Sequence, residues 1–240
     1  MAHRYFTENI NEKTAKILGE DARHLGKVLR VKIGEELTLC DGKGTDFLGK
    51  VTAVCENEIE LEILSSIKNV SEASVSVTIY VGYPKGDKLE LIIQKATELG
   101  CVKIVPFFSK FCVVTPKKED AKNLRYQKIA YEAAKQSGRG AIPEVCLPIS
   151  FKEMLEQQKL FDLSLFCYEA KDEGIPLHSQ LENKKTIAII TGAEGGFDED
   201  EVTQAEKVSS VISLGKRILR CETAPLAAVS AVMVLTGNLQ

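Results

Sequence analysis

The chain has 240 residues, a formal net charge of −3, 44% hydrophobic residues and 27% charged residues. This composition is typical of a globular protein and excludes a disordered chain. Trp is absent, which excludes an aromatic cage or stacking platform built on Trp. The longest apolar run, 224–235, contains Pro225 and Ser230. It is shorter than the roughly 20 residues of a membrane span.

The first residues and the cysteines bear on where the protein works. The N-terminus lacks the apolar core of a secretory signal, and the seven cysteines form no CxxC pair. Their odd number favours reduced thiols over a disulfide framework or a zinc site. The three histidines are scattered along the chain, so no metal site is predicted. We therefore expect a soluble cytoplasmic protein with no membrane partner.

Two segments are basic although the chain as a whole is not. Residues 1–32 hold seven Lys and Arg against four Asp and Glu, and residues 103–139 hold nine against three. If the fold brings these segments together, they present a basic face to the phosphates of a nucleic acid. If it does not, they are two ordinary solvated surfaces. Composition leaves both interpretations open.

Residues 1–70 are predicted to form a small β-rich domain. We expect a helix over 21–29 and three strands over 35–40, 47–54 and 59–64, with a turn at 41–44 between the first two strands. In the last strand, apolar side chains alternate with glutamates, which is the period of a half-buried strand. Several short strands with one helix indicate a compact barrel.

The polar segment 68–74 is predicted to separate this barrel from a second domain, 71–240, in which strands and helices alternate. The expected strands are 75–81, 102–107, 163–167, 186–190 and 211–214, and the expected helices are 86–99, 121–136 and 225–235. In the first helix, apolar residues share one face, and Gly100 stands where a helix C-terminus favours glycine. This alternation indicates an α/β fold with a parallel sheet.

The first candidate site is a glycine-rich loop directly after the predicted strand 186–190. It reads Thr191, Gly192, Ala193, Glu194, Gly195, Gly196, Phe197. Glycines at the carboxyl end of a buried strand let the backbone approach a ligand closely, although a tight turn without a ligand would use the same residues. Asp198 and Glu201 have the spacing of a capping box. The four acids 198–201 are therefore interpreted as a helix start and not as a metal site.

The surroundings of this loop restrict its ligand. Its glycine spacing matches neither the dinucleotide-binding nor the P-loop pattern. The acids that open the next helix would repel a phosphate placed at that N-terminus. A ligand here should be neutral or cationic, and S-adenosylmethionine, which carries a sulfonium and no phosphate, meets that condition.

A second candidate loop follows the predicted strand 211–214. It combines Gly215 with three cations, a carboxylate and a hydroxyl, namely Lys216, Arg217, Arg220, Glu222 and Thr223. A cationic loop that only caps a strand is the alternative. Polar groups gathered at a second strand end favour a functional site.

These residues resemble the RsmE family of bacterial 16S rRNA uracil-N3 methyltransferases, which are members of the SPOUT class. The resemblance rests on the two loops and on three further segments, 3–6, 24–44 and 136–139. It runs from the first residues to about Pro225. The family loop reads Gly-Pro-Glu-Gly-Gly, and this chain has Ala193 at the Pro position. That change removes a restraint on φ but no side chain needed for chemistry.

The resemblance implies a SPOUT-type parallel sheet with a C-terminal trefoil knot, one of the rare knotted topologies, after a PUA-like β-barrel that binds RNA. It implies S-adenosylmethionine as cofactor, held largely by backbone groups of Thr191, Gly192, Ala193, Glu194, Gly195 and Gly196 and of Leu214, Gly215, Lys216, Arg217, Ile218 and Leu219. The implied partners are 16S rRNA of the small ribosomal subunit and a second copy of the chain in a homodimer.

Methylation of uracil N3 needs the reactants held in line and the N3 proton removed. Arg139 and Arg220 are the candidate donors to the charge that develops on O2 and O4. Glu194 and Glu222 are the candidate bases, although each could instead satisfy backbone N–H groups of its loop. The candidate phosphate contacts, any one of which could be an ordinary surface residue, are Arg4, Arg23, Lys27, Arg30, Lys32 and Arg125.

Three other functions remain to be weighed. The chain could be a catalytically silent RNA-binding or ribosome-assembly protein, which the intact loops disfavour. It could be a SPOUT enzyme acting on a ribose 2′-OH or another base, which the full-length resemblance disfavours. An enzyme with a phosphate-bearing cofactor is disfavoured by the acidic helix start.

Overall fold

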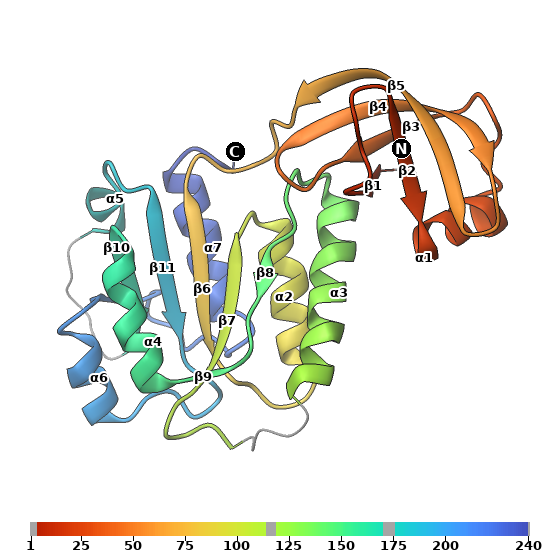
Figure 1. The fold of residues 1–240 in the computed structure, drawn as a ribbon. Coiled ribbons are helices and arrows are strands. Elements are labelled where there is room, and N and C mark those ends of the chain that lie inside the picture. Colours follow the sequence, from red (N-terminus) through yellow and green to blue (C-terminus); the bar gives the residue numbers. More distant parts are fainter. Residues whose placement is uncertain (1–3, 114–118, 170–175, 240) are drawn as a thin grey trace. The chain divides into compact units, whose positions relative to one another are not determined.

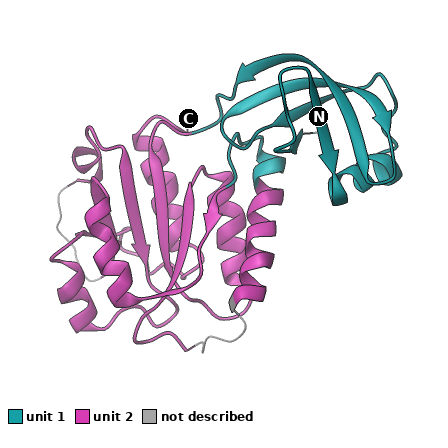
Figure 2. Ribbon diagram, viewed as in Figure 1, with its two compact units in different colours: residues 1–72, 134–142 teal, residues 73–133, 143–240 magenta. Residues whose placement is uncertain are grey.

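The computed structural model describes residues 4–113, 119–169 and 176–239. The chain forms two compact units, shown in Figure 2. Unit 1 comprises residues 1–72 and 134–142, and unit 2 comprises residues 73–133 and 143–240. The first residue of the segment 3–6, His3, lies outside the described residues.

Unit 1 contains a curled sheet with the strand order β1-β3-β4-β5-β2 (Figure 1). These strands are Arg4–Phe6, Glu36–Cys40, Thr45–Val54, Glu58–Lys68 and Thr14–Leu18, respectively. Strand β1 runs parallel to β3, and the other pairs are antiparallel. The β4–β5 pair shifts register twice, after Leu48 and after Val51, and such bulges bend a sheet. The predicted small β-rich domain is confirmed as a curled five-stranded sheet, with β1 and β2 as additional strands.

The predicted helix 21–29 is also present. It consists of α1, Gly19–Arg23, and a π-helical continuation, η1, His24–Leu29. Ala22 and Leu25 are fully buried in the core of unit 1. Arg30 ends the helix in the left-handed region with φ of 54°, and the Val31 N–H donates to the Leu25 carbonyl. A non-glycine residue in that region is uncommon, so this turn is held by its surroundings.

Unit 2 is built on a parallel sheet with the strand order β12-β10-β11-β6-β7-β8, and β9 also pairs with β7. In chain order the strands are β6 Ser76–Gly82, β7 Lys103–Phe108, β8 Glu144–Val145, β9 Ile149–Ser150, β10 Leu163–Cys167, β11 Thr186–Thr191 and β12 Ser210–Ile212. Nearly every residue of β6, β10 and β11 is buried, as expected for strands covered on both faces. The predicted parallel α/β fold is confirmed.

Helices cover both faces of this sheet (Figure 1). The helices of unit 2 are α2 Lys88–Glu98, α3 Glu119–Ser137, α4 Phe151–Gln157, the 3-10 turn η2 Gln158–Leu160, α5 Leu177–Gln180, α6 Glu199–Ala205 and α7 Ala224–Leu235, although the last turn of α3 belongs to unit 1. Residues of α2, α3 and α7 share one core with the sheet, and residues of α4 and α6 share another. No helix within the described ranges is both long and apolar enough to cross a membrane.

Two sequence signals place the helix ends as expected. Helix α2 buries Leu89, Ile92, Ile93 and Ala96 and is followed by Gly100 with φ of 94°. Helix α6 begins with the predicted capping box, in which Asp198 accepts from the Asp200 N–H and Glu201 accepts from the Asp198 N–H. The acids 198–201 therefore start a helix, as predicted. The trefoil knot stays a prediction.

Candidate functional site

A pocket of about 340 Å³ opens at the carboxyl edge of the unit 2 sheet. This volume is within the range of small-molecule sites. Strands β11 and β12 flank β10 and run parallel to it, so the loops that follow all three leave the sheet at one edge. The described lining residues are Lys88, Cys167, Glu169, Thr191, Gly192, Ala193, Glu194, Gly196, Phe197, Ile218, Leu219, Arg220, Cys221 and Ala224.

The glycine-rich loop forms a tight turn and also lines one wall of the pocket. The Gly196 N–H donates to the Ala193 carbonyl at 3.0 Å, and Gly196 has φ of 64°, where a side chain would be strained. Phe197 fixes the end of the turn, because its ring lies 4.3 Å from that of Phe166 between centroids. A Cβ on Gly82, at the end of β6, would lie 2.4 Å from the Ala193 nitrogen. The loop thus rests directly on β6 and presents its backbone to the pocket.

Thr191 leaves a hydrogen-bonding group unused in the pocket wall. Thr191 is only 1% exposed, and its Oγ1 has no hydrogen-bond partner among the described residues. A buried hydroxyl without a partner costs free energy, and such groups are rare in folded proteins. A ligand that hydrogen-bonds to this hydroxyl would remove that cost.

Three charged side chains meet beside the pocket. Lys88 Nζ lies 2.8 Å from Glu194 Oε1 and 3.6 Å from Glu222 Oε2. Burial alone would raise the pKa of Glu194, but hydrogen bonds from Lys88 and from backbone N–H groups hold it below its ordinary value. A hydrogen bond from its own N–H likewise lowers the pKa of Glu222. Both carboxylates are therefore ionised at neutral pH.

The two thiols of the pocket are held in their protonated form. Burial raises the pKa of Cys167 to about 12 and that of Cys221 to about 11. Because the thiolate is the nucleophilic form of cysteine, these protonated thiols do not carry covalent catalysis at neutral pH. The lining can therefore bind and orient a neutral or cationic ligand between apolar and hydrogen-bonding groups. Ala193, Phe197, Ile218 and Leu219 supply the apolar part. This lining fits S-adenosylmethionine.

Most of the predicted cofactor residues line this pocket. Those that do are Thr191, Gly192, Ala193, Glu194, Gly196, Ile218 and Leu219, joined by Arg220. Within the described lining, Gly195, Leu214, Gly215, Lys216 and Arg217 are absent. Gly195 faces elsewhere, because a Cβ added there would lie 2.6 Å from Phe111 Cβ.

The lining also contains Lys88, Cys167 and Glu169, which sequence reasoning missed, and two residues of the second candidate loop that are not among the predicted cofactor contacts, Cys221 and Ala224. Cys167 and Glu169 could have been found, because they end or follow the predicted strand 163–167 and ligands bind at such strand ends. Lys88 carries no comparable signal, since it begins a helix that reads only as amphipathic.

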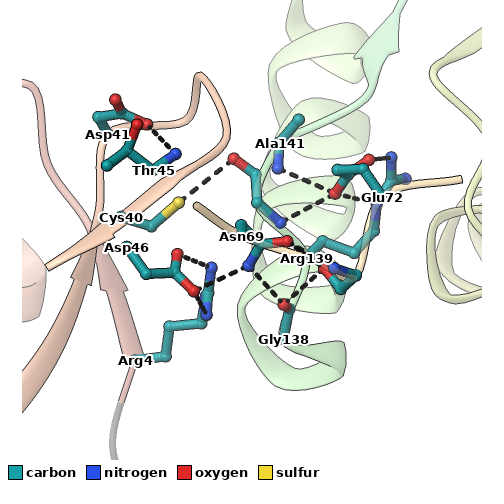
Figure 3. Close-up of polar contacts among 12 residues, drawn as sticks. Arg4, Cys40, Asp41, Thr45, Asp46, Asn69, Glu72, Gly138, Arg139 and Ala141 are labelled. Atoms are coloured by element: carbon teal, nitrogen blue, oxygen red, sulfur yellow. Dashed lines mark hydrogen bonds and ion pairs between the residues drawn. The ribbon is translucent and has the colours of Figure 1, made fainter. Parts of the chain in front are cut away.

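Arg139 has a structural partner within unit 1. Arg139 is only 3% exposed, and its Nη2 donates to Glu72 Oε2 at 2.6 Å (Figure 3). Glu72 Oε1 accepts from Arg139 Nε at 3.2 Å and from the N–H groups of Gly140 and Ala141 at 2.8 and 3.1 Å. The described lining of the unit 2 pocket does not include Arg139. Its catalytic role stays a prediction.

The predicted phosphate contacts fall into three environments. Arg4 forms an ion pair with Asp46, and its side chain is only 12% exposed, so this residue braces the barrel. Arg23, Lys27, Arg30 and Lys32 are exposed around η1, where Arg23 donates to Asn57 and Lys27 pairs with Glu56. Arg125 lies on α3 and pairs with Glu90 at 2.8 Å. The contact of these residues with phosphates stays a prediction.

Comparison with known proteins identifies the family. Residues 71–233 match the family model described as an RNA methyltransferase domain, and residues 17–64 match an RNA methyltransferase PUA domain. The ribosomal RNA small subunit methyltransferase E of Bacillus subtilis is 35% identical over 99% of this chain and 98% of its own length. That of Mesomycoplasma hyopneumoniae is 34% identical over 93% and 96%.

Solved structures agree with these sequence matches. A crystal structure of a ribosomal RNA small subunit methyltransferase E from Neisseria gonorrhoeae, bound to S-adenosyl methionine, superposes with a TM-score of 0.88. It is 32% identical and covers 98% of each chain. The sequence matches, the PUA-type barrel and the α/β domain lead to one assignment. The chain belongs to the ribosomal RNA small subunit methyltransferase E family and is an RNA methyltransferase.

Proposed function

We propose that this protein transfers the methyl group of S-adenosylmethionine to N3 of a uracil in 16S rRNA of the small ribosomal subunit. The observation that carries the proposal is the unit 2 pocket, which is lined by the two loops of the family resemblance. Its lining combines apolar side chains with the carboxylates of Glu169 and Glu194, which suit a cation, and with the cations Lys88 and Arg220. The homologue from Neisseria gonorrhoeae was crystallised with S-adenosyl methionine, which supports the same cofactor here.

The backbone of residues 191–194, 196 and 218–219 would hold the cofactor, with the Thr191 hydroxyl as a further hydrogen-bonding group. When bound, the cofactor supplies a methyl group on a sulfonium. The predicted cofactor residues outside the lining would contribute by setting the course of the two loops; they are Gly195, Leu214, Gly215, Lys216 and Arg217. Arg220 lines the pocket and carries a permanent positive charge. Its guanidinium would donate to a uracil oxygen as N3 loses its proton.

Glu194 and Glu222 fit a role as fixed charges better than a role as bases. A carboxylate whose pKa is held below its ordinary value is a weak base toward an imide proton. Fixed negative charge beside the pocket would instead attract the sulfonium. Loss of the N3 proton would then depend on Arg220, which donates to a uracil oxygen, and on solvent, which would accept the proton.

The barrel and a second copy of the chain complete the proposal. Residues 1–70 would act as the RNA-binding domain, with Arg23, Lys27, Arg30 and Lys32 toward phosphates, and residues 71–240 as the methyltransferase domain. Ile218 lines the pocket and is 84% exposed, so a second protomer could cover it in a homodimer. The place of action would be the cytoplasm, where ribosomal subunits are assembled.

The test is a methylation assay with labelled S-adenosylmethionine and unmodified small ribosomal subunits, followed by mass spectrometry of the digested nucleosides. N3-methyluridine is the expected product. A different methylated nucleoside would contradict the target atom, and a chain that neither binds cofactor nor incorporates label would be a silent RNA-binding protein. An Arg220→Ala variant should methylate about a hundredfold more slowly at saturating cofactor.

A further inference from the structure

Lys88 connects the two loops that line the pocket. It is the first residue of α2, and its Nζ reaches Glu194 on the loop after β11 at 2.8 Å. The same Nζ lies 3.6 Å from Glu222, on the loop before α7, and 3.7 Å from the Sγ of Cys221. One ammonium therefore touches both walls of the site.

The carboxylate of Glu194 is oriented by more than this ion pair. Its Oε1 accepts a second hydrogen bond from the Lys85 N–H at 3.1 Å. The Glu194 and Glu222 side chains are 30% and 18% exposed, so neither is fully hydrated. Arg220 is the other cation that acts on Glu222, and it comes from the same loop. Among the described groups that perturb these residues, Lys88 alone acts on both carboxylates.

Two partly buried carboxylates that share a counterion behave differently when that counterion is lost. With Lys88 present, both stay ionised, and the hydrogen bond to Glu194 in turn raises the pKa of Lys88. Without Lys88, burial and mutual repulsion would raise the pKa of the carboxylates, so that the pair takes up a proton in mild acid.

We propose that Lys88 is a positioning residue that holds Glu194, in the pocket lining, and Glu222, beside it, together as ionised carboxylates, so that the site distinguishes the cationic S-adenosylmethionine from its neutral product, S-adenosylhomocysteine. This inference rests on the proposed function, because it takes that cofactor as the ligand. It assigns the selectivity to long-range charge, since the two ligands differ at the sulfur by one methyl group and one positive charge.

The test measures the affinity of both ligands by calorimetry at about pH 5.5 and about pH 7.5, on either side of the range in which an unpaired carboxylate couple would titrate. The reported quantity is the Kd of the product divided by the Kd of the cofactor. Using this ratio cancels titrations of the shared adenine and amino-acid parts of the ligands. The variants are Lys88→Met, which removes the charge, and Lys88→Arg, which keeps it. Lys95→Met is the matched control, because Lys95 lies on the same helix and pairs with Glu98 outside the pocket lining.

In the wild type, Lys88→Arg and Lys95→Met, the ratio should be the same at both pH values. In Lys88→Met, it should fall about threefold to tenfold on acidification, as one negative charge near the sulfonium is lost. Adding Glu194→Gln to Lys88→Met should abolish this pH dependence, because only one carboxylate of the couple remains. A merely structural role of Lys88 would weaken both ligands equally and leave the ratio flat.

A folded Lys88→Met variant with a pH-independent ratio would overturn the inference and leave the proposed function intact. So would a wild-type ratio that already falls in acid. A wild-type protein that does not bind S-adenosylmethionine would instead overturn the proposed function.

Discussion

Arg139 and Glu72 form a two-point ion pair in which Nη2 donates to Oε2 at 2.6 Å and Nε to Oε1 at 3.2 Å. The same carboxylate accepts the N–H groups of Gly140 and Ala141, so it joins the segment after β5 to the loop after α3 (Figure 3). Such bidentate pairs between a guanidinium and a carboxylate fix geometry as well as adding energy. The segment 136–139, which belongs to the family resemblance, thus has a structural function within unit 1.

Removing the guanidinium should destabilise the protein. In Arg139→Ala, Glu72 would stay partly buried and lose its cation, and we expect a loss of about 2–3 kcal/mol in the free energy of unfolding. The measurement is urea denaturation followed by circular dichroism. Lys27→Ala is the control, because Lys27 and Glu56 form an exposed pair, and its transition should match the wild type. An Arg139→Ala transition equally close to the wild type would show that the pair does not stabilise the fold.

The same pair predicts a pH dependence. Burial would raise the pKa of Glu72, but the hydrogen bond from Arg139 outweighs it and holds the pKa below its ordinary value of 4.5. The stabilisation is therefore present above pH 4.5 and is lost as the pH falls through the lowered folded value. In Arg139→Ala only the hydrogen bonds from the Gly140 and Ala141 N–H groups oppose burial, so the pKa of Glu72 rises relative to the wild type and this contribution to stability is reduced.

The stability difference between the wild type and Arg139→Ala should accordingly stay constant above pH 4.5 and shrink as the pH falls from 4.5 through the lowered folded value. Urea transitions recorded in steps across that range measure it. A difference that stays constant with pH would mean that Glu72 is not the group left unpaired.

Gly140 should not tolerate a side chain, although its φ is ordinary. A Cβ there would lie 2.7 Å from Asn69 Cγ. Asn69 cannot easily move, because its Nδ2 donates to Asp46 at 2.8 Å and its Oδ1 accepts from the Ser71 N–H at 2.9 Å (Figure 3). Gly140→Ala should therefore cost about 1–3 kcal/mol in the free energy of unfolding.

Gly26→Ala is the matched control for that substitution. The nearest atom to its added Cβ is Val54 Cγ1 at 3.8 Å, an ordinary contact, and Gly26 does not have a positive φ. This change should be neutral or stabilise the protein slightly, since it reduces the entropy of the unfolded chain. Equal unfolding midpoints for the two variants would contradict the role given to Asn69.

The parts of the fold that the sequence predicts are those with a local pattern. The alternation of Ile59 and Leu61 with glutamates predicts β5, and the apolar run 163–167 predicts β10 with the observed bounds. Strand β1 has three residues and β2 buries only Ala15 and Ile17, so neither shows enough of a period to be recognised. Their place in the sheet depends on pairing with β3 and β5.

The sequence likewise predicts only the part of the candidate site that has a local pattern. Its two loops follow predicted strands and are glycine-rich or densely charged, so sequence reasoning finds them. The pairs that fix the charges join residues far apart, Lys88 with Glu194 and Arg139 with Glu72. No local pattern encodes such contacts, so the ion pair of Arg139 with Glu72 cannot be predicted from its glycine-flanked loop. The orientation of Gly195 toward Phe111 cannot be predicted from the sequence either, because a turn with several glycines does not show which of them faces the ligand.

The close approach of β6 to the glycine-rich loop can be tested at Gly82. In Gly82→Ala, the added Cβ would lie 2.4 Å from the Ala193 nitrogen and 2.8 Å from the Gly192 carbonyl carbon, so the backbone must shift. We expect at least a tenfold loss of affinity for S-adenosylmethionine, since a displacement of the pocket wall by a few tenths of an ångström breaks several ~1 kcal/mol contacts. Calorimetry on the folded variant measures this. The Gly26→Ala variant should retain the wild-type affinity, and a Gly82→Ala variant that does so too would contradict the placement of the site.

Thr191→Val separates the fold from the ligand, because the two effects have opposite signs. The Thr191 hydroxyl is buried without a partner among the described residues, and valine has nearly the same shape. Without ligand, the variant should be as stable as the wild type or more stable by about 1 kcal/mol, since an unsatisfied polar group is removed. With S-adenosylmethionine, it should bind about fivefold to tenfold more weakly, since a hydrogen bond to the ligand is lost. Thermal unfolding with and without cofactor gives both quantities from one preparation. A variant destabilised in the absence of ligand would mean that the hydroxyl has a partner within the protein, and an unchanged affinity would mean that the ligand does not reach β11.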